Sequence, residues 1–251
     1  MARRSPIALL AVLSLAMPGF VSAADPAVPL QSADVDVSNQ ASLQRGAKLY
    51  MNYCAACHSL QYVRYNTLAE GLGLTIDQVA ENLQFAGGTQ HDQIRIAMPA
   101  EAAATWFGLP PPDLSLIARS RGNDYVYTFL KSFYADPGQR GTGANNLVLA
   151  GTAMPHVLWP LQGIQEAVYR QETGPDGAQR EVFDRFELAV PGSMSPEEFD
   201  RAARDITAFL SWAAEPMQLE RQRLGIIVLL FLLVLFTFSW LYYKELWKDV
   251  K

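Results

Sequence analysis

The sequence predicts a mostly α-helical protein with one C-terminal transmembrane helix. Apolar residues recur at helical spacing in two long segments, residues 42–53 and 196–214, as expected where one helix face packs against a core. Residues 224–243 form a run of twenty residues without a charge. As a helix this run would be about 30 Å long, which matches the hydrocarbon core of a bilayer.

The N-terminus has the pattern of a secretory signal peptide over residues 1–24. Arg3 and Arg4 precede an apolar stretch at residues 7–16, and small residues at 21–24 offer a cleavage site. The apolar stretch is too short to span a bilayer comfortably. Cleavage would place the following residues on the outer side of a bacterial inner membrane. It would also remove two positive charges, so that the formal net charge of −5 becomes −7.

The exported N-terminal part sets the expected orientation of the C-terminal helix. Aromatic residues at 240–243 are typical of a membrane interface, and lysines at 244, 248 and 251 favour a cytoplasmic end. Two arginines, at 221 and 223, weaken that charge bias, so the orientation depends on the signal peptide. The expected division is a signal peptide (1–24), one periplasmic domain (25–220), a membrane anchor (221–244) and a cytoplasmic tail (245–251).

Local signals predict the elements between these segments. Thr75 with Gln78, and Ser195 with Glu198, match the capping box that begins a helix, and Asn123 is expected to cap a further helix. The remaining expectations are a mostly irregular stretch at 97–113, a turn-rich loop at 136–146, and a hairpin turn at 173–177 between short strands at 168–170 and 182–188.

The two cysteines of the chain lie in one motif, Cys54-Ala55-Ala56-Cys57-His58. Cys-x-x-Cys-His is the attachment signature of a c-type haem. Two thiols at this spacing can form thioethers to the two vinyl groups of one porphyrin, and the following imidazole then faces the iron. A redox-active disulfide is an alternative. Half of a zinc site is another, but tetrahedral zinc needs two further ligands, and no third cysteine exists.

A sixth iron ligand is expected, and residue type alone leaves it undecided. Thioether sulfur raises the reduction potential of a c-type haem and suits electron transfer. Met98 and Met154 each precede a proline, which stiffens a loop, and the two are about equally suitable. His156 is a third option, which would give bis-histidine ligation. The other methionines after the signal peptide are better explained by position or packing: Met51, Met194 and Met217.

Several stretches together resemble the cytochrome c1 family, the haem-carrying subunits of the cytochrome bc1 complex. The Cys-x-x-Cys-His motif alone is shared by many cytochromes, whereas Trp-Ala-Ala-Glu-Pro before a terminal span is much more specific. The matching stretches run from about residue 42 to the anchor: Arg45–Gly46, Cys54–Leu60, Pro111–Ser115, Arg119–Arg121, Met154–Trp159 and Phe209–Pro216.

This resemblance implies a class I cytochrome c fold with loop insertions, in which the 42–53 and 196–214 helices pack across one another. It implies one covalent haem c on Cys54 and Cys57, iron ligation by His58 and Met154, and Arg121 facing a haem propionate, where a charge-assisted bond would offset the carboxylate. Some relatives carry an extra disulfide before the methionine. Both cysteines here are committed, which leaves open how residues 134–147 are held.

The resemblance also implies an electron-transfer subunit of a quinol–cytochrome c oxidoreductase rather than a catalyst on its own. Electrons would arrive from a Rieske iron–sulfur protein and leave to a soluble c-type cytochrome. Cytochrome b and membrane lipid would be further partners, and nucleic acid would not. One alternative is another membrane-anchored c-type cytochrome, such as an oxidase or dehydrogenase subunit. The other is a periplasmic thiol–disulfide protein, with a reducible bond between its two cysteines and no haem.

The charge distribution is uneven along the chain. Residues 166–220 contain twelve Asp or Glu against five Arg, a local net charge of −7. An acidic patch beside an exposed haem edge would steer a basic soluble cytochrome by long-range attraction. An ordinary solvated surface has the same composition, so the sequence is compatible with both interpretations.

Overall fold

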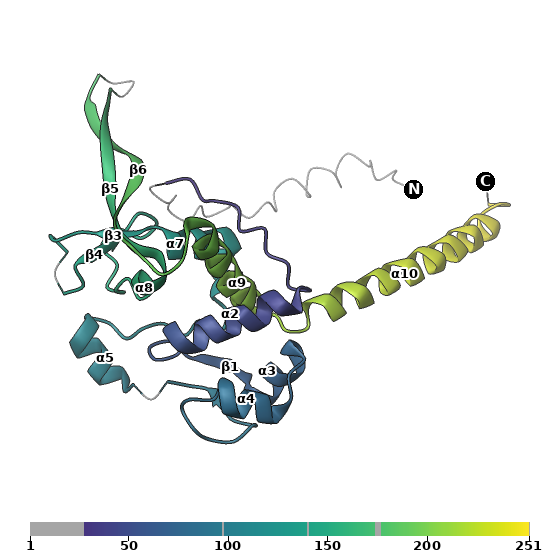
Figure 1. Cartoon of the computed structure of the whole chain (residues 1–251). Coiled ribbons are helices and arrows are strands. Elements are labelled where there is room, and N and C mark those ends of the chain that lie inside the picture. The colour runs from purple at the N-terminus through teal and green to yellow at the C-terminus, as the bar shows by residue number, and fades with distance from the viewer. Residues whose placement is uncertain (1–27, 97, 140, 174–176, 251) are drawn as a thin grey trace.

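Two long helices cross at the centre of the body (Figure 1). The computed structural model describes residues 28–96, 98–139, 141–173 and 177–250, so the predicted signal peptide lies outside it. Helix α2 (Gln40–Tyr53) packs against α9 (Pro196–Ala214). The rings of Tyr50 and Phe209 lie 5.5 Å apart. A Cβ added at Gly46 would lie 2.0 Å from the carbonyl oxygen of Asp205. The predicted crossing of these helices is therefore confirmed, with their backbones in contact.

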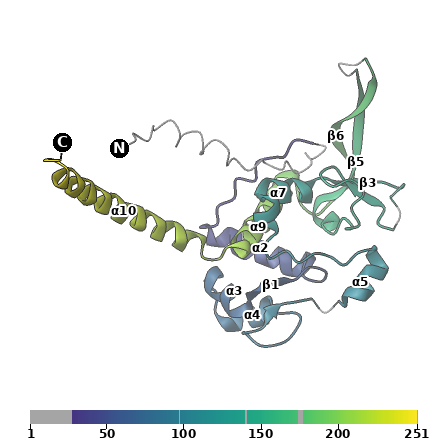
Figure 2. The ribbon, with the colours of Figure 1, turned by 180° about the vertical axis from the view of Figure 1, so that it is seen from behind.

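The other elements lie on two sides of this crossing, as both ribbon views show (Figures 1 and 2). On one side are β1 (Leu60–Arg64), α3 (Tyr65–Leu72), α4 (Ile76–Asn82), β2 (Gln93–Ile94) and α5 (Ala100–Phe107). On the other are α7 (Asn123–Lys131), β3 (Phe133–Ala135), β4 (Ala144–Asn146), α8 (Trp159–Gln162), β5 (Gly163–Thr173) and β6 (Gln179–Pro191). A short helix, α6 (Ile117–Arg121), packs on α9. The strands of the described residues pair as β1–β2, β3–β4 and β5–β6, all antiparallel.

Two predicted helix starts are confirmed by their caps. Thr75 and Gln78 form both bonds of a capping box before α4, and Ser195 and Glu198 do the same before α9. In contrast, α7 begins at Asn123 itself, after Gly122 (φ 90°), and no side chain caps it. The expectation that Asn123 is the cap is therefore wrong, because the glycine reverses the backbone one residue earlier.

Residues 97–113 are not mostly irregular as predicted, because α5 occupies Ala100–Phe107. Four of its eight residues are alanine, which has the highest helix propensity. The helix begins after Pro99 and ends at Gly108, which adopts the left-handed conformation (φ 83°). The prolines that suggested a loop therefore lie just outside the helix, where proline is tolerated.

The segment between residues 134 and 147 is held without a disulfide. Its ends pair as β3 and β4, and Asn146, which is fully buried, fixes it from within. The Asn146 amide donates to the carbonyl of Phe129 (2.8 Å), and its side-chain oxygen accepts from the backbone amides of Val148 (2.9 Å) and Leu149 (3.2 Å). One buried side chain thus connects the end of α7 to the chain that leads towards Met154.

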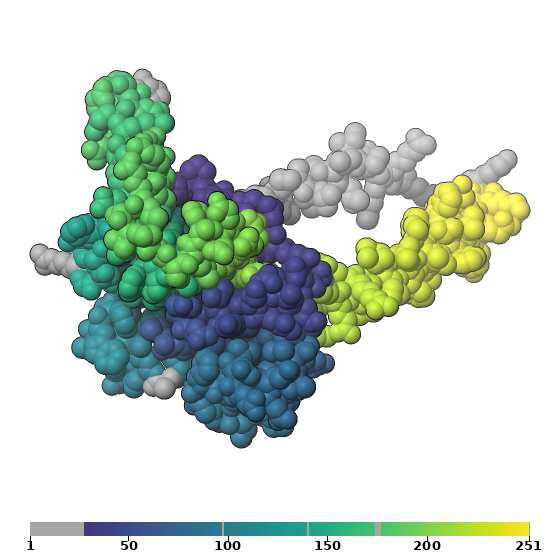
Figure 3. All heavy atoms as spheres, viewed as in Figure 1, coloured from purple at the N-terminus to yellow at the C-terminus, as the bar shows by residue number. Residues whose placement is uncertain are grey.

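Strands β5 and β6 form a long hairpin that projects from the body (Figures 1 and 3). They are longer than the predicted strands at 168–170 and 182–188, and the predicted turn falls largely outside the described residues. At the base, Gly163 (φ 95°) approaches the other strand so closely that a Cβ would lie 2.3 Å from the carbonyl oxygen of Val190. Toward the tip, the described residues 169–173 and 177–182 are all exposed.

Helix α10 (Gln218–Leu246) leaves the body as one straight rod (Figures 2 and 3). It is long and apolar enough to cross a membrane, and none of its residues is buried against the body. Pro216 separates it from α9. Arg221 donates to the Glu215 carboxylate on the other side of this break, so an ion pair fixes the direction in which the anchor leaves.

Candidate haem site

The Cys54–His58 motif forms one tight turn at the C-terminal end of α2. Cys54 caps the helix, with its backbone amide bonded to the carbonyl of Tyr50. The amides of Cys57 and His58 both donate to the Cys54 carbonyl, at 3.0 and 2.9 Å. This turn brings the two thiols and the imidazole of His58 into one short segment, as haem attachment requires.

The His58 ring is oriented by a carbonyl from a distant part of the chain. Its Nδ1 lies 2.7 Å from the carbonyl oxygen of Pro112. A carbonyl can only accept, so Nδ1 carries the proton and Nε2 keeps its lone pair. Burial lowers the pKa of His58, which keeps the ring neutral at pH 7. A neutral imidazole whose Nδ1–H is bound to a carbonyl is the usual form of a histidine that ligates iron through Nε2.

The turn is also fixed from the side of the core. The Tyr50 hydroxyl donates to the backbone carbonyl of His58, and the Leu114 amide donates to the carbonyl of Ser59 (2.9 Å). His58 is only 9 % exposed. The ring and the backbone of His58 are therefore both held before any ligand contributes, and the donor set fits a c-type haem.

The thiols are unsuited to redox exchange. Both are free, with Cys54 buried. Burial raises the pKa of the Cys54 thiol to about 12 and also raises that of Cys57. Thiol–disulfide exchange depends on a thiolate with a lowered pKa, so this environment argues against the thiol–disulfide alternative. Among the described residues, no cluster of three or more His, Cys, Asp or Glu could hold a metal ion.

Met154 and Arg121 lie on separate segments from the turn. Met154 is half-buried between β4 and α8, where its backbone amide is 3.4 Å from the Thr152 hydroxyl. Arg121 is exposed at the end of α6, with its guanidinium 5.4 Å from the centre of the Tyr125 ring. Within the described part of the chain, neither side chain hydrogen-bonds to the Cys54–His58 turn. Their roles toward haem stay predictions.

His156 is half-buried, and both of its ring nitrogens are shielded from solvent. Its ring stacks on Phe133 with centroids 5.1 Å apart and planes inclined by 6°. Burial lowers its pKa to about 4, so the ring is neutral at pH 7. The parallel stacking on a buried strand residue favours a packing role for His156 over axial ligation.

The acidic residues of the 166–220 segment are divided among several ion pairs. Asp205 is buried against Arg45 (2.6 Å), and Asp200 lies between Lys131 (2.5 Å) and Arg204 (3.1 Å). In the described strands of the hairpin, Arg170 and Arg185 pair with three further carboxylates: Glu172, Glu187, and Asp184, which both arginines contact. Local neutralisation favours an ordinary solvated surface over one acidic patch.

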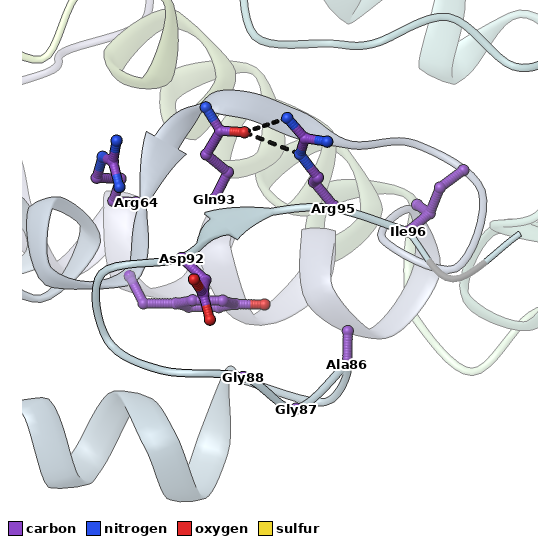
Figure 4. Close-up of a pocket in the computed structure, with 9 residues that line it drawn as sticks. Arg64, Ala86, Gly87, Gly88, Asp92, Gln93, Arg95 and Ile96 are labelled. Atoms are coloured by element: carbon purple, nitrogen blue, oxygen red, sulfur yellow. Dashed lines mark hydrogen bonds between the residues drawn. The ribbon is translucent and has the colours of Figure 1, made fainter.

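A cavity of about 570 Å³ lies beside β1 and β2 (Figure 4). Arg64, Gly88, Asp92 and Arg95 contribute to its lining, and Arg95 donates to the side-chain oxygen of Gln93 through Nε (2.8 Å) and Nη2 (2.5 Å). None of the five predicted haem-site residues lines it. The cavity is therefore separate from the Cys54–His58 turn.

Two site residues escaped prediction from the sequence. Pro112 supplies the acceptor for His58, and Tyr50 supplies a donor to its backbone. Tyr50 lies in the 42–53 segment, whose apolar spacing predicts core packing but no hydrogen bond to the haem motif. Pro112 lies in the Pro111–Ser115 stretch that resembles the cytochrome c1 family, so the resemblance marks this segment but not the hydrogen bond. The pairing itself spans 54 residues and is visible only in the folded chain.

Comparison with known proteins agrees with this geometry. The sequence model of the cytochrome c1 family matches residues 32–166 and 193–250. Cytochrome c1 of Allochromatium vinosum is 48 % identical over 96 % of this chain and 98 % of the relative. The ammonia monooxygenase gamma subunit of Nitrosomonas europaea is 39 % identical over 89 % of each chain. Mitochondrial cytochrome c1 of Saccharomyces cerevisiae is 32 % identical over 85 % of this chain and 68 % of its own length. The chain therefore belongs to the cytochrome c1 family, whose members carry one covalently bound haem c.

Proposed function

We propose that this protein is a membrane-anchored c-type cytochrome that passes electrons from a Rieske iron–sulfur protein to a soluble c-type cytochrome. It would do so within a quinol–cytochrome c oxidoreductase, next to cytochrome b. The observation that carries the proposal is the Cys54–His58 turn, in which the His58 Nδ1–H is bound to the Pro112 carbonyl and Nε2 is left for iron. Bound haem supplies the one-electron ferric–ferrous couple.

The proposal assigns a role toward haem to each of five residues. Cys54 and Cys57 attach the porphyrin, His58 and Met154 ligate the iron, and Arg121 faces a propionate. The class I cytochrome c fold is part of the same proposal, and the central crossing of α2 and α9 supports it. By holding His58 through its ring and its backbone, the protein limits movement of the ligand between oxidation states, which favours fast electron transfer.

The proposed topology places residues 25–220 in the periplasm, the anchor at 221–244 in the bacterial inner membrane, and residues 245–251 in the cytoplasm. The signal-peptide pattern of residues 1–24 supports this orientation. The single apolar helix among the described residues supports one crossing. Membrane lipid is then the medium around α10.

Purification from membranes in mild detergent tests the function. We expect cytochrome b and a Rieske protein to co-purify with this chain, and we expect the denatured chain to keep a c-type pyridine haemochrome spectrum. Co-purification with copper or an oxidase haem would instead identify another membrane-anchored cytochrome. A colourless denatured chain at the apoprotein mass would exclude covalent haem.

A matched pair of variants tests the attachment itself. Cys54→Ala combined with Cys57→Ala should give a chain from which acidified acetone extracts all haem. Ser59→Ala, one residue beyond the motif, should keep covalent haem. Equal haem retention in both proteins would contradict attachment at this turn.

A further inference from the structure

Asp113 lies next to the carbonyl that orients His58, and both of its carboxylate oxygens accept backbone hydrogen bonds. Oδ1 accepts from the amide of Ser115 (2.9 Å). Oδ2 accepts from the amide of Gln61 (2.9 Å), which is 52 residues away in the sequence and lies in β1. The carboxylate therefore bridges the segment that contains Pro112 and the strand that follows His58.

Other bonds make this bridge part of a short ladder. The Leu114 amide donates to the Ser59 carbonyl (2.9 Å), and the Tyr62 amide is 3.2 Å from the hydroxyl of Ser115. Ser115 is fully buried. Along this ladder, Asp113 follows Pro112 directly, and its partner Gln61 lies three residues after His58. Replacing Asp113 should therefore affect both partners of the His58–Pro112 hydrogen bond: the His58 ring, which donates it, and the Pro112 carbonyl, which accepts it.

We propose that Asp113 is a positioning residue: its carboxylate holds the Pro112 carbonyl against Nδ1 of His58. It thereby sets the electron-donating strength of the imidazole toward haem iron. The proposal rests on the proposed ligand role of His58. A hydrogen bond from the ring N–H to an acceptor raises the basicity of the other ring nitrogen and fixes the ring orientation. A more basic ligand favours ferric over ferrous iron.

The charge of Asp113 acts in the same direction. In the oxidised state the iron centre carries one more positive charge, so a nearby carboxylate stabilises ferric iron. His58 is almost completely buried, and in such surroundings charges are screened less than in water. Geometry and charge therefore both predict that Asp113 lowers the midpoint potential.

Asp113→Asn in the purified complex tests the proposal. The amide keeps the shape of the side chain, but it removes the charge and offers an N–H₂ group where the Gln61 amide needs an acceptor. We expect covalent haem to remain. We expect the ferric–ferrous equilibrium to shift about tenfold toward ferrous iron, a rise of about 59 mV for a one-electron couple. The His58 Nδ1 proton should exchange with solvent at least about tenfold faster by NMR, because a tenfold change corresponds to only about 1.4 kcal/mol of opening free energy.

Asp124→Asn is the matched control. Asp124 accepts one backbone hydrogen bond through its side chain, from the amide of Ala33 (2.8 Å), which the Asn side-chain oxygen can keep, so this variant removes a carboxylate charge elsewhere in the body without breaking that bond. A role of Asp113 in stability alone predicts a lower melting temperature for Asp113→Asn and an unchanged potential in both variants. Our proposal predicts a changed potential and faster proton exchange in Asp113→Asn only.

Asp113→Glu separates the effect of geometry from the effect of charge. It is also the test variant if Asp113→Asn does not yield a protein that carries haem. It keeps the carboxylate but displaces it, so we expect faster exchange of the His58 Nδ1 proton and a smaller potential shift than in Asp113→Asn. If every haem-carrying variant has the wild-type exchange rate of the His58 Nδ1 proton and the wild-type midpoint potential, the proposal is overturned. A wild-type chain without covalent haem would overturn both the proposal and the proposed function.

Discussion

His58 is held at two points by residues that the haem motif does not contain. The Pro112 carbonyl binds the ring at 2.7 Å, and the Tyr50 hydroxyl binds the backbone carbonyl. Tyr50 is fully buried, and burial raises its pKa, so its hydroxyl is protonated and can donate at pH 7. The turn is therefore supported by α2 on one side and by the proline segment on the other.

Tyr50→Phe should lower the free energy of unfolding by about 1 to 2 kcal/mol, because the His58 carbonyl would lose a buried donor. The ring would keep its packing against Phe209, so covalent haem should remain. Thermal or denaturant unfolding of the holoprotein measures the difference. Tyr62→Phe is the control, since Tyr62 is 66 % exposed and its change should be within about 0.5 kcal/mol. Equal effects of the two variants would contradict the role of the Tyr50 hydroxyl.

Met154→Ala should lower the midpoint potential, because thioether ligation raises the potential of a c-type haem. We expect a shift of more than about tenfold in the ferric–ferrous equilibrium, or about 59 mV, with the haem still covalently attached. A redox titration followed by the α-band measures it. Met98→Ala is the matched variant, since Met98 also precedes a proline. A large shift in Met98→Ala and none in Met154→Ala would reverse the assignment.

At the scale of elements, the crossing of α2 and α9 leaves no room for a side chain at one position. The Cβ of an alanine at Gly46 would lie 2.0 Å from the Asp205 carbonyl oxygen and 2.8 Å from the Cβ of Phe209. The first of these atoms belongs to the backbone, so the conflict is relieved only if a helix moves.

Gly46→Ala should therefore destabilise the protein by about 3 kcal/mol or more, despite the higher helix propensity of alanine. Gly225→Ala provides the control, because nothing lies within 4 Å of its added Cβ. Melting temperatures of the two detergent-solubilised proteins measure the effect. A Gly46→Ala protein as stable as the wild type would show that the two helices do not approach as closely as described.

Asp200 connects α9 to α7. Burial raises its pKa, but hydrogen bonds from Lys131, Tyr127 and Arg204 outweigh burial and lower the pKa to about 2. The unfolded-state value is about 3.9. Ionised Asp200 therefore stabilises the protein fully above that value, and the stabilisation is lost as the pH falls toward 2.

Asp200→Asn should accordingly cost about 1 kcal/mol at pH 7, a value discounted for partial exposure, and progressively less below about pH 4. Denaturant unfolding at a series of pH values measures the difference from the wild type. Glu70→Gln, at an exposed position of α3, controls for the loss of one surface charge. A difference that stays constant from pH 7 to pH 3 would mean that the ion pairs of Asp200 do not stabilise the fold.

Sequence patterns predicted features that depend on residues close together in the chain. They missed features that depend on contacts between distant parts of the chain. The capping boxes of α4 and α9 involve residues three apart, and both helix starts were predicted. Helix α5 was missed because prolines flank a run of alanines that has no apolar stripe. The Cys-x-x-Cys-His spacing predicted the candidate haem turn, whereas the Pro112 acceptor depends on a contact across 54 residues. The choice between Met98 and Met154 needed the family resemblance, because both have the same local sequence.

At the scale of the whole molecule, the body and the anchor are joined but share no core. None of the residues of α10 is buried. The junction is held mainly by Glu215, whose pKa is lowered by its hydrogen bond from Arg221, and Arg119 of α6 lies 3.9 Å from the same carboxylate. The body therefore has its complete set of buried residues without the anchor.

A chain that ends after Met217 should consequently fold, attach haem and appear in the soluble periplasmic fraction. Its melting temperature should lie within a few degrees of that of the full-length protein, because no buried apolar surface is lost. Fractionation followed by haem staining measures the distribution. A truncated chain that stays with the membrane, or that lacks covalent haem, would contradict this independence.

The hairpin of β5 and β6 has a practical consequence. Its two ends meet at Gly163 and Gly192, where a Cβ on Gly192 would lie 2.4 Å from the Gly163 nitrogen. The family match is interrupted over residues 167–192, which is almost the whole hairpin. Because the two strands already meet at the base of the hairpin, residues inserted between the strands do not change how the rest of the chain is connected. A fluorescent label or purification tag introduced there should therefore leave the crossing of the two long helices undisturbed.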